Sequence, residues 1–210
     1  MKTNRSVQKA PSAHQIQLTG ERQKTADFLA VDIEGAKRVD RQLASLSIEQ
    51  KVGQIMTINY KPKFYNRQSY AFKQLIKYVE KYHVGGVAIS SGTPYAVART
   101  IDQLQAAAKI PLLVMADMEW GTSMRVEGGT TFLPNMAIGA TGSEEYAYEM
   151  GKITAEEARR IGVHINYAPV VDVNNNPDNI IINTRSFGED PQFVARMGAA
   201  FIRGLQENGV

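Results

Sequence analysis

The chain has 210 residues, 43% of them hydrophobic and 21% charged, which is an ordinary composition for a globular protein. Its net charge of +3 is mild, and we read its basic residues as spread along the sequence without a stripe of interleaved aromatics, which argues against nucleic acid as a partner. Cysteine is absent, which excludes disulfides, thiolate metal sites and a cysteine nucleophile. The three histidines lack metal-ligand spacing, so we expect no metal, no cofactor and plain structural roles for them. No apolar run is long enough to span a membrane.

The N-terminal segment has no pattern of a folded element. It is rich in Ser, Gln and Lys as far as Gly20, and no apolar stretch of a signal peptide follows its basic residues. We therefore expect residues 1–32 to form a disordered or extended leader, and residues 33–210 to form the folded part.

Helical periodicity begins over residues 33–46. Ser47 then opens a capping box with Gln50 at its third helical position, which predicts a further helical turn. Residues 53–59 are predicted as the first strand. On the helix over 33–46, one face carries Val39, Leu43 and Leu46.

Four further elements continue the alternation of helix and strand. Residues 66–82 have the spacing of a helix with one buried face, and residues 87–90 follow as the second strand. Thr93 and Pro94 begin a helix that runs to about Lys109. Residues 112–116, a short continuous apolar run, are predicted as a third strand buried on both faces.

The last part of the chain gives a fourth unit. A helix begins after Ser143, and a strand is predicted over 165–173, made irregular by Pro169 because proline has no N–H for the ladder. Asp190 then caps a final helix. The residues expected to face the core are Tyr146, Met150, Ile153 and Ile161 on the first of these helices and Phe193, Met197, Phe201 and Leu205 on the second.

Four strands, each followed by a helix, predict an α/β fold with a parallel sheet and right-handed crossovers. Asn208 and Gly209 are predicted to end the last helix, and Val210 is predicted to be the first residue of another strand. We therefore expect the chain to stop partway through its fold.

The stretch after the third strand concentrates the polar chemistry. Asp117, Glu119, Trp120 and Arg125 follow within a few residues, at the strand end where parallel α/β folds bind ligands. Carboxylates, a guanidinium and an indole suit a polyhydroxylated ligand, because they bind hydroxyls and cover the apolar side of a ring. The alternative is structural: an N-cap aspartate, a surface glutamate and an ordinary ion pair with Arg125.

Four motifs resemble one family in the order in which that family has them. They are D-M-E-W-G-T-S-M-R, L-P-N-M-A-I-G-A-T, N-Y-A-P-V-V-D-V-N and T-R-S-F-G-E-D-P. From about Leu46 to Val210 the chain resembles the N-terminal catalytic domain of glycoside hydrolase family 3, in its β-N-acetylhexosaminidase (β-N-acetylglucosaminidase) branch. The resemblance implies a (β/α)8 TIM-type barrel of which only about the first four βα units are present.

The resemblance also implies which residues bind sugar. Asp117 matches the family's aspartate that grips sugar hydroxyls, and Arg125 and Arg185 match its substrate-binding arginines. The family's first motif is usually D-x-E-G-G-R-V-x-R, and here Trp120 stands in place of its first glycine, so we expect this loop to differ in shape from the usual one. Trp120 is a candidate for stacking on sugar.

Three other residues receive structural interpretations. Glu119 is expected to organise its loop, and Asp172 its own turn. Tyr167 is a further candidate for stacking on sugar, but we expect it to lie in the core.

The chemistry that the resemblance implies is removal of terminal β-linked N-acetylglucosamine with retention, by an aspartate nucleophile and a histidine–aspartate acid/base pair. The family's K-H-F-P-G-H-G segment, its D-x-H dyad and its nucleophile cannot be placed before Val210. We therefore assign no catalytic residue and expect residues 1–210 alone to be inactive. The partner is expected to be an N-acetylglucosamine-containing oligosaccharide or muropeptide, in the bacterial cytoplasm or periplasm. The alternatives are a β-glucosidase of the same family and an inactive carbohydrate-binding fragment.

Overall fold

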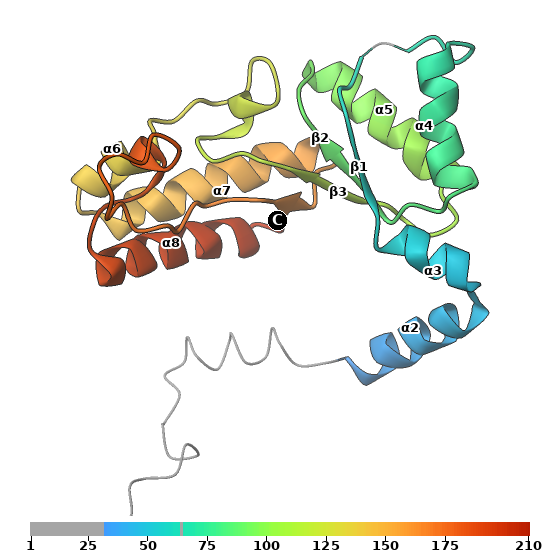
Figure 1. Cartoon of the computed structure of the whole chain (residues 1–210), viewed down its shortest axis with the longest axis horizontal. Coiled ribbons are helices and arrows are strands. Elements are labelled where there is room, and N and C mark those ends of the chain that lie inside the picture. Colours follow the sequence, from blue (N-terminus) through green and yellow to red (C-terminus); the bar gives the residue numbers. More distant parts are fainter. Residues whose placement is uncertain (1–31, 64) are drawn as a thin grey trace, which may run out of the picture. The chain divides into compact units, whose positions relative to one another are not determined.

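The computed structural model describes residues 32–210 except residue 64, and it contains two units, one ending at Leu46 and the other beginning at Ser47 (Figure 1). In the first unit, helix α2 (Ile33–Ser45) is present as predicted. The carboxylate of Asp32 caps it by accepting the N–H of Glu34 at 3.1 Å. None of its residues is buried, so Val39 and Leu43 are not core residues there. The leader predicted over 1–32 lies outside the described residues apart from Asp32.

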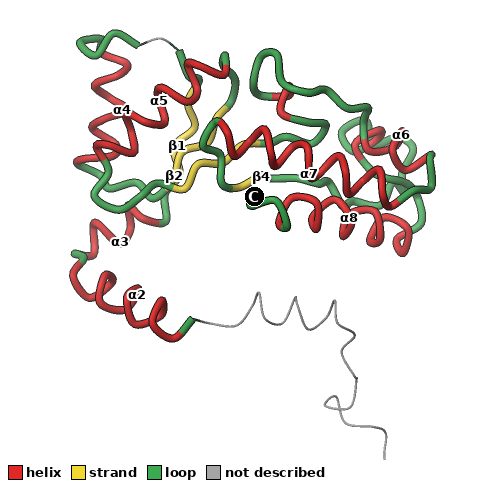
Figure 2. The backbone as a smooth tube through the Cα atoms, turned by 180° about the vertical axis from the view of Figure 1, so that it is seen from behind, coloured by secondary structure: helices red, strands yellow, loops and turns green. Residues whose placement is uncertain are grey.

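The second unit is a parallel four-stranded sheet in sequence order β1-β2-β3-β4, with helices after the strands (Figure 2). This order is that of consecutive βα units in an arc of a barrel wall, as predicted. The strands are β1 (Thr57–Tyr60), β2 (Gly86–Ile89), β3 (Leu113–Ala116) and β4 (Ile165–Asn166). The α-helices are α3 (Ile48–Gln54), α4 (Tyr70–Glu80), α5 (Pro94–Ala107), α6 (Asn135–Ala140), α7 (Glu144–Arg160) and α8 (Pro191–Gln206).

The first strand begins later than predicted. The capping box is confirmed, since the Gln50 N–H donates to the Ser47 hydroxyl and the Ser47 N–H donates to the Gln50 side chain. The helix that it starts, α3, then continues through Gly53, which the sequence reading had placed in the strand. Ile55 ends that helix and is 82% exposed, so it does not point into the sheet's core. A strong helix start outweighed the apolar pattern that followed it.

The fourth strand is shorter than predicted. Only Ile165 and Asn166 pair with β3, and the backbone turns irregular before Pro169, where an interruption was expected. The last ladder bond runs from the N–H of Tyr167 to the carbonyl of Ala116 at 2.9 Å. Tyr167 is 55% exposed, so its assignment to the core was wrong.

Two hydrophobic clusters support the sheet. One joins β1, β2 and β3 to α4 and α5, and it includes the fully buried Val87, Val97 and Leu104. The other lies between α7 and α8, where Met150, Met197 and Phe201 are buried as predicted, whereas Tyr146 is 59% exposed and was wrongly placed inside.

The two helices of this second cluster approach closely. A Cβ at Gly204 would lie only 2.1 Å from the carbonyl of Tyr148, so only glycine fits there. Within residues 32–63 and 65–210, no helix is long and apolar enough to cross a bilayer.

A histidine takes part in the junction of the last two strands. His164 donates its backbone N–H to the Val114 carbonyl at 2.8 Å, and its ring Nδ1 accepts the Val114 N–H at 3.1 Å. The ring is therefore a structural acceptor, and it must be unprotonated at Nδ1 to accept. Burial lowers the pKa of His164, and the positive charge of Arg159 adds to this effect.

This lowered pKa predicts a pH dependence of stability. The native state prefers the neutral ring, so the contribution of His164 is present above the unfolded pKa of about 6.5 and is lost as pH falls through the lower folded pKa. His164→Asn keeps an acceptor near the Nδ1 position and removes the titration. We expect the unfolding free energy of this variant, measured in urea, to fall less between about pH 7 and pH 5 than that of the wild type.

His83→Asn is the matched control. His83 has a positive φ of 52°, which asparagine tolerates, and its ring Nε2 lies 3.4 Å from the side-chain nitrogen of Gln50. This variant should keep the wild-type pH slope. If His164→Asn kept that slope as well, the neutral-acceptor role of His164 would be wrong.

Candidate functional site

The backbone of Asp117, Met118 and Glu119 leaves the carboxyl end of β3 and is held there by one side chain of β4. The amide of Asn166 accepts the Met118 N–H at 2.8 Å and donates to the Met118 carbonyl at 3.3 Å. Met118 itself is fully buried in the first core cluster. The two acids are therefore fixed on either side of a residue that is anchored through both its backbone and its side chain.

Two ion pairs meet at this strand end. Arg125 Nη2 lies 3.0 Å from Asp117 Oδ2. Arg185 forms a fork with Glu119, in which Nε donates to Oε2 at 2.9 Å and Nη2 donates to Oε1 at 2.8 Å. The Glu119 side chain is only 7% exposed, while that of Asp117 is 46% exposed. Asp117 is thus the carboxylate that a ligand can reach, and Glu119 is committed to Arg185.

The electrostatics show that these pairs belong to one cluster. The hydrogen bonds that Arg185 donates to Glu119 raise the pKa of Arg185, burial opposes this, and the charges of Glu119, Asp172 and Asp117 add to the rise. Asp117 and Arg185, predicted from different motifs, are therefore brought within electrostatic reach of each other. Arg125 joins them through its ion pair with Asp117.

The loop that carries Arg185 is anchored by buried polar groups. Asn135, at the start of α6, is 2% exposed and donates its side-chain N–H to the Arg185 carbonyl at 2.8 Å. The hydroxyl of Ser186 donates to the Asp172 carbonyl at 2.6 Å. Asp172 therefore helps to anchor this loop through its carbonyl, and the role expected of it in organising its own turn stays a prediction.

Arg125 is fixed from the neighbouring strand. The N–H of Gly92, just beyond β2, donates to the Arg125 carbonyl at 2.9 Å, and the Glu127 N–H donates back to the Gly92 carbonyl at 2.9 Å. These bonds form a parallel bridge between Gly92 and Val126. Three successive strands therefore contribute to holding the site.

The backbone conformation explains why a tryptophan can stand at position 120, where the family's motif usually has a glycine. Gly121 has a φ of +98°, and a Cβ there would lie 2.3 Å from the Thr130 carbonyl, so this position needs glycine. Trp120 has no such positive φ and can carry a side chain. Its ring packs against the second core cluster and is half-buried. Whether it stacks on sugar stays a prediction.

Glu157 of α7 holds the remainder of the loop. Its carboxylate accepts hydrogen bonds from the hydroxyl of Thr122 and, at 2.5 Å and 3.1 Å, from the hydroxyl and N–H of Thr130. Burial would raise the pKa of Glu157, but these hydrogen bonds outweigh it, and the pKa lies below its ordinary value. The loop between β3 and α6 is therefore tied to α7 by an ionised carboxylate.

Sequence reasoning missed three of these supporting residues. Asn135 and Asn166 stand inside the quoted motifs, so their motif positions were an available signal. Glu157 stands in an ordinary helix and had no signal of its own. The described residues contain no group of three or more His, Asp or Glu side chains placed to hold a metal ion.

Comparison with known proteins shows the family of the chain. Residues 47–210 match the family described as the glycosyl hydrolase family 3 N terminal domain. A β-N-acetylglucosaminidase/β-glucosidase of Cellulomonas fimi is 34% identical over 189 residues, which cover 89% of this chain and 32% of the relative. β-Hexosaminidase A of Pseudoalteromonas piscicida is 34% identical over 150 residues, 65% of this chain and 25% of the relative. The chain thus spans a third or less of the length of these relatives.

Solved structures show the same fold. A β-glucoside phosphorylase superposes with a TM-score of 0.78 at 30% identity, over 86% of this chain and 32% of that protein. A family 3 β-N-acetylglucosaminidase from Paenibacillus sp. FPU-7 has a TM-score of 0.70 at 37% identity, over 79% of this chain and 32% of that protein. The four βα units are accordingly part of a TIM-type barrel, and the chain belongs to the glycoside hydrolase family 3 N-terminal domain family.

Proposed function

We propose that this chain supplies part of the sugar-binding site of a glycosidase that removes terminal β-linked N-acetylglucosamine. The observation that carries the proposal is the cluster at the end of β3, where a half-exposed Asp117 pairs with Arg125 and lies within electrostatic reach of Arg185. The names of the relatives from Cellulomonas fimi and Pseudoalteromonas piscicida support the glycosidase class.

The site has unused hydrogen-bonding capacity that fits hydroxyl groups. Arg185 uses three of the five N–H donors of a guanidinium, on Glu119 and on the Ile181 carbonyl, and two remain for a ligand. Asp117 accepts a hydrogen bond from Arg125 through Oδ2 and keeps acceptor positions for sugar hydroxyls. Charge-assisted bonds of this kind are among the stronger ones in proteins.

We propose a retaining mechanism in which these residues bind and do not react. A retaining glycosidase needs a carboxylate nucleophile and an acid/base on opposite sides of the anomeric carbon. Asp117 and Arg185 would orient the ring toward such groups, and hydrogen bonds that strengthen in the transition state would raise the rate. No residue described here is assigned either reacting role.

A β-glucoside is the second candidate substrate. The Cellulomonas fimi relative carries both activities in its name, and one similar structure is named a β-glucoside phosphorylase. The two candidates differ at the 2-position of the sugar, where one has an acetamido group and the other a hydroxyl. Binding of the two monosaccharides therefore separates them.

Trp120 gives a direct readout, because it is the only tryptophan of the chain and lies in the motif loop. We expect its fluorescence to change saturably when residues 1–210 are titrated with N-acetylglucosamine, and less with glucose. If neither sugar produced a saturable fluorescence change, the proposed site would be contradicted. A preference for glucose would favour the second candidate.

The proposed role of Asp117 predicts a loss of affinity. Asp117→Ala removes a charged acceptor and should weaken N-acetylglucosamine binding about 10-fold or more, since a hydrogen bond to a charged group contributes about 1.5–3 kcal/mol. Asp102→Ala removes an acid whose side chain is 73% exposed on α5 and should bind as the wild type does. Equal affinities for the two variants, with thermal melts unchanged, would remove Asp117 from the site.

The fork predicts that lysine cannot replace Arg185. Arg185→Lys loses one of two parallel bonds to the buried Glu119 and should cost about 1–3 kcal/mol of unfolding free energy, together with most of the affinity that Arg185→Ala loses. Urea unfolding and the same titration measure both effects.

Arg125→Lys is the matched control, because Arg125 makes a single bond to Asp117 that an ammonium can reproduce. It should cost less in both assays than Arg185→Lys. If the two lysine variants behaved alike, the planar fork would have no special role.

A further inference from the structure

One segment has a higher net positive charge than the complete chain. Residues 61–82 contain six basic residues and one acidic residue, a net charge of +5, while the complete chain has +3. Four of the nine tyrosines of the chain fall in the same segment. The basic residues are Lys61, Lys63, Arg67, Lys73, Lys77 and Lys81, and the acid is Glu80.

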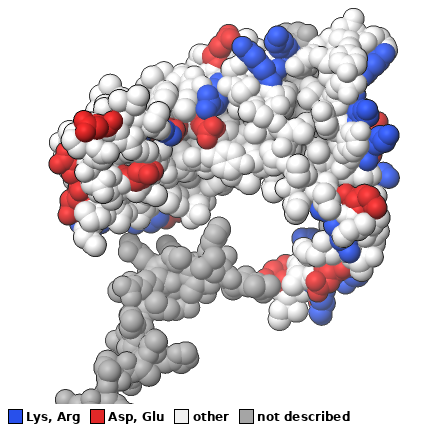
Figure 3. Space-filling view, viewed as in Figure 1, with Lys and Arg blue, Asp and Glu red and all other residues white. Residues whose placement is uncertain are grey.

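Helix α4 arranges part of this charge in a stripe. Lys73, Lys77 and Lys81 follow one another at intervals of four residues, which places them about 6 Å apart along the helix axis. Basic side chains gather over α4 in the space-filling view (Figure 3). The sequence reading had judged the basic residues to be spread out, and that judgement was wrong for this helix.

These cations have no acidic partner. All three lysines and Arg67 are exposed, and within the described part of the chain none of them lies within 4.0 Å of a carboxylate. The stripe therefore keeps its full charge available to an external anion.

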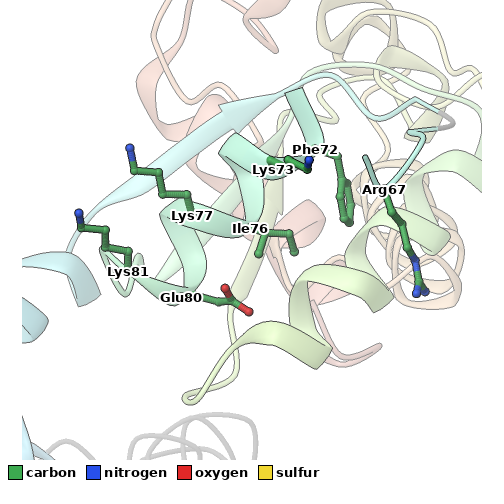
Figure 4. A pocket seen from close by; sticks show the side chains of 7 residues that line it. All are labelled: Arg67, Phe72, Lys73, Ile76, Lys77, Glu80 and Lys81. Atoms are coloured by element: carbon green, nitrogen blue, oxygen red, sulfur yellow. The ribbon is translucent and has the colours of Figure 1, made fainter. Parts of the chain in front are cut away.

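A shallow hollow of about 350 Å³ runs along the stripe. Its lining combines basic side chains with the apolar Phe72 and Ile76, and it includes Glu80 (Figure 4). Figure 4 shows Lys77 and Lys81 extending in the same direction from successive turns of α4, away from the carboxylate of Glu80. The hollow thus offers ammonium groups beside apolar surface.

A second hollow of about 410 Å³ adjoins the first through Lys77, which lines both. Among its other lining residues are Val52 of α3 and Met56 just beyond that helix, which are 51% and 54% exposed. Tyr78 and Tyr82 also line it and are 41% and 46% exposed. Lysine, tyrosine and exposed aliphatic side chains are therefore neighbours on this surface.

We propose that this surface, called the α4 face and made of Lys73, Lys77, Lys81, Tyr78, Tyr82, Val52 and Met56, docks onto an anionic lipid bilayer. Lysines near an anionic leaflet are attracted to its phosphates, tyrosine rings settle at the headgroup level, and aliphatic side chains enter the boundary of the acyl region. The α4 face presents all three kinds of side chain together.

Nucleic acid fits the same face less well. Base stacking needs a free aromatic face, but the Lys77 and Lys81 ammonium groups lie 5.7 Å and 5.8 Å from the centre of the Tyr82 ring. Nucleic-acid interfaces are also highly polar, and exposed valine and methionine contribute nothing to phosphate binding. Charge and apolar surface together therefore favour lipid.

Vesicle flotation of the complete chain tests the proposal. We expect the protein to float with vesicles that contain phosphatidylglycerol, to stay behind with pure phosphatidylcholine, and to be released at about 0.5 M salt, where charges are screened within a few ångströms. The triple variant K73Q/K77Q/K81Q should bind at least about 30-fold more weakly, because each lysine near an anionic surface contributes roughly a fivefold factor.

Two further triples keep the test specific. K73R/K77R/K81R preserves the charge and should float as the wild type does. K109Q/R160Q/R203Q removes the same charge from exposed residues outside the α4 face and should also float. Circular dichroism melts confirm that each variant is folded.

Three outcomes would overturn the proposal. They are equal losses in both glutamine triples, equal binding to neutral vesicles, and no binding to anionic vesicles by the wild type. Retention of a single-stranded oligonucleotide that depends on the same three lysines, without vesicle binding, would assign the α4 face to nucleic acid.

Discussion

The pairing of the buried Glu119 with Arg185 is the constraint on which the candidate site depends. A carboxylate that is 7% exposed would be costly without a charged partner, and the guanidinium supplies two parallel hydrogen bonds to it. The pair joins the end of β3 to a loop 66 residues further along the chain. Because Asn135 holds the backbone of that loop, the arginine is fixed at both its head and its base. In the proposed function, this preorganisation means that the remaining N–H donors of Arg185 bind a sugar without a further ordering cost.

The sequence allowed most of the element order to be predicted, because helix caps and apolar periods act locally. The alternation of strands and helices follows from such signals, and the Ser47 capping box was read correctly. The predicted element boundaries were wrong where two local signals competed. Gly53 belongs to helix α3 and not to the first strand. The fourth strand ends at Asn166, although the apolar run in the sequence continues beyond it. Pairing across long separations has no local signal, so the role of Glu157 in fixing the loop could not be anticipated.

The site residues illustrate the same limit. These residues were identified from the resemblance of their motifs to those of a family, and the structure then showed that they differ in exposure and in partners. The side chain of Asp117 is accessible to a ligand, whereas that of Glu119 is buried and paired with Arg185. The sequence did not suggest this pairing. The α4 face lies on the outside of the sheet, where no motif of the family draws attention. Its charge became visible once the lysines were seen on successive turns of one helix (Figure 4).

A crystal structure of the chain soaked with N-acetylglucosamine tests the central claim most directly. The account predicts sugar hydroxyls within hydrogen-bond distance of the Asp117 carboxylate and of a free Arg185 N–H, with both bonds between Arg185 and Glu119 intact. A sugar bound away from the end of β3, or one that displaces Glu119 from the guanidinium, would contradict it.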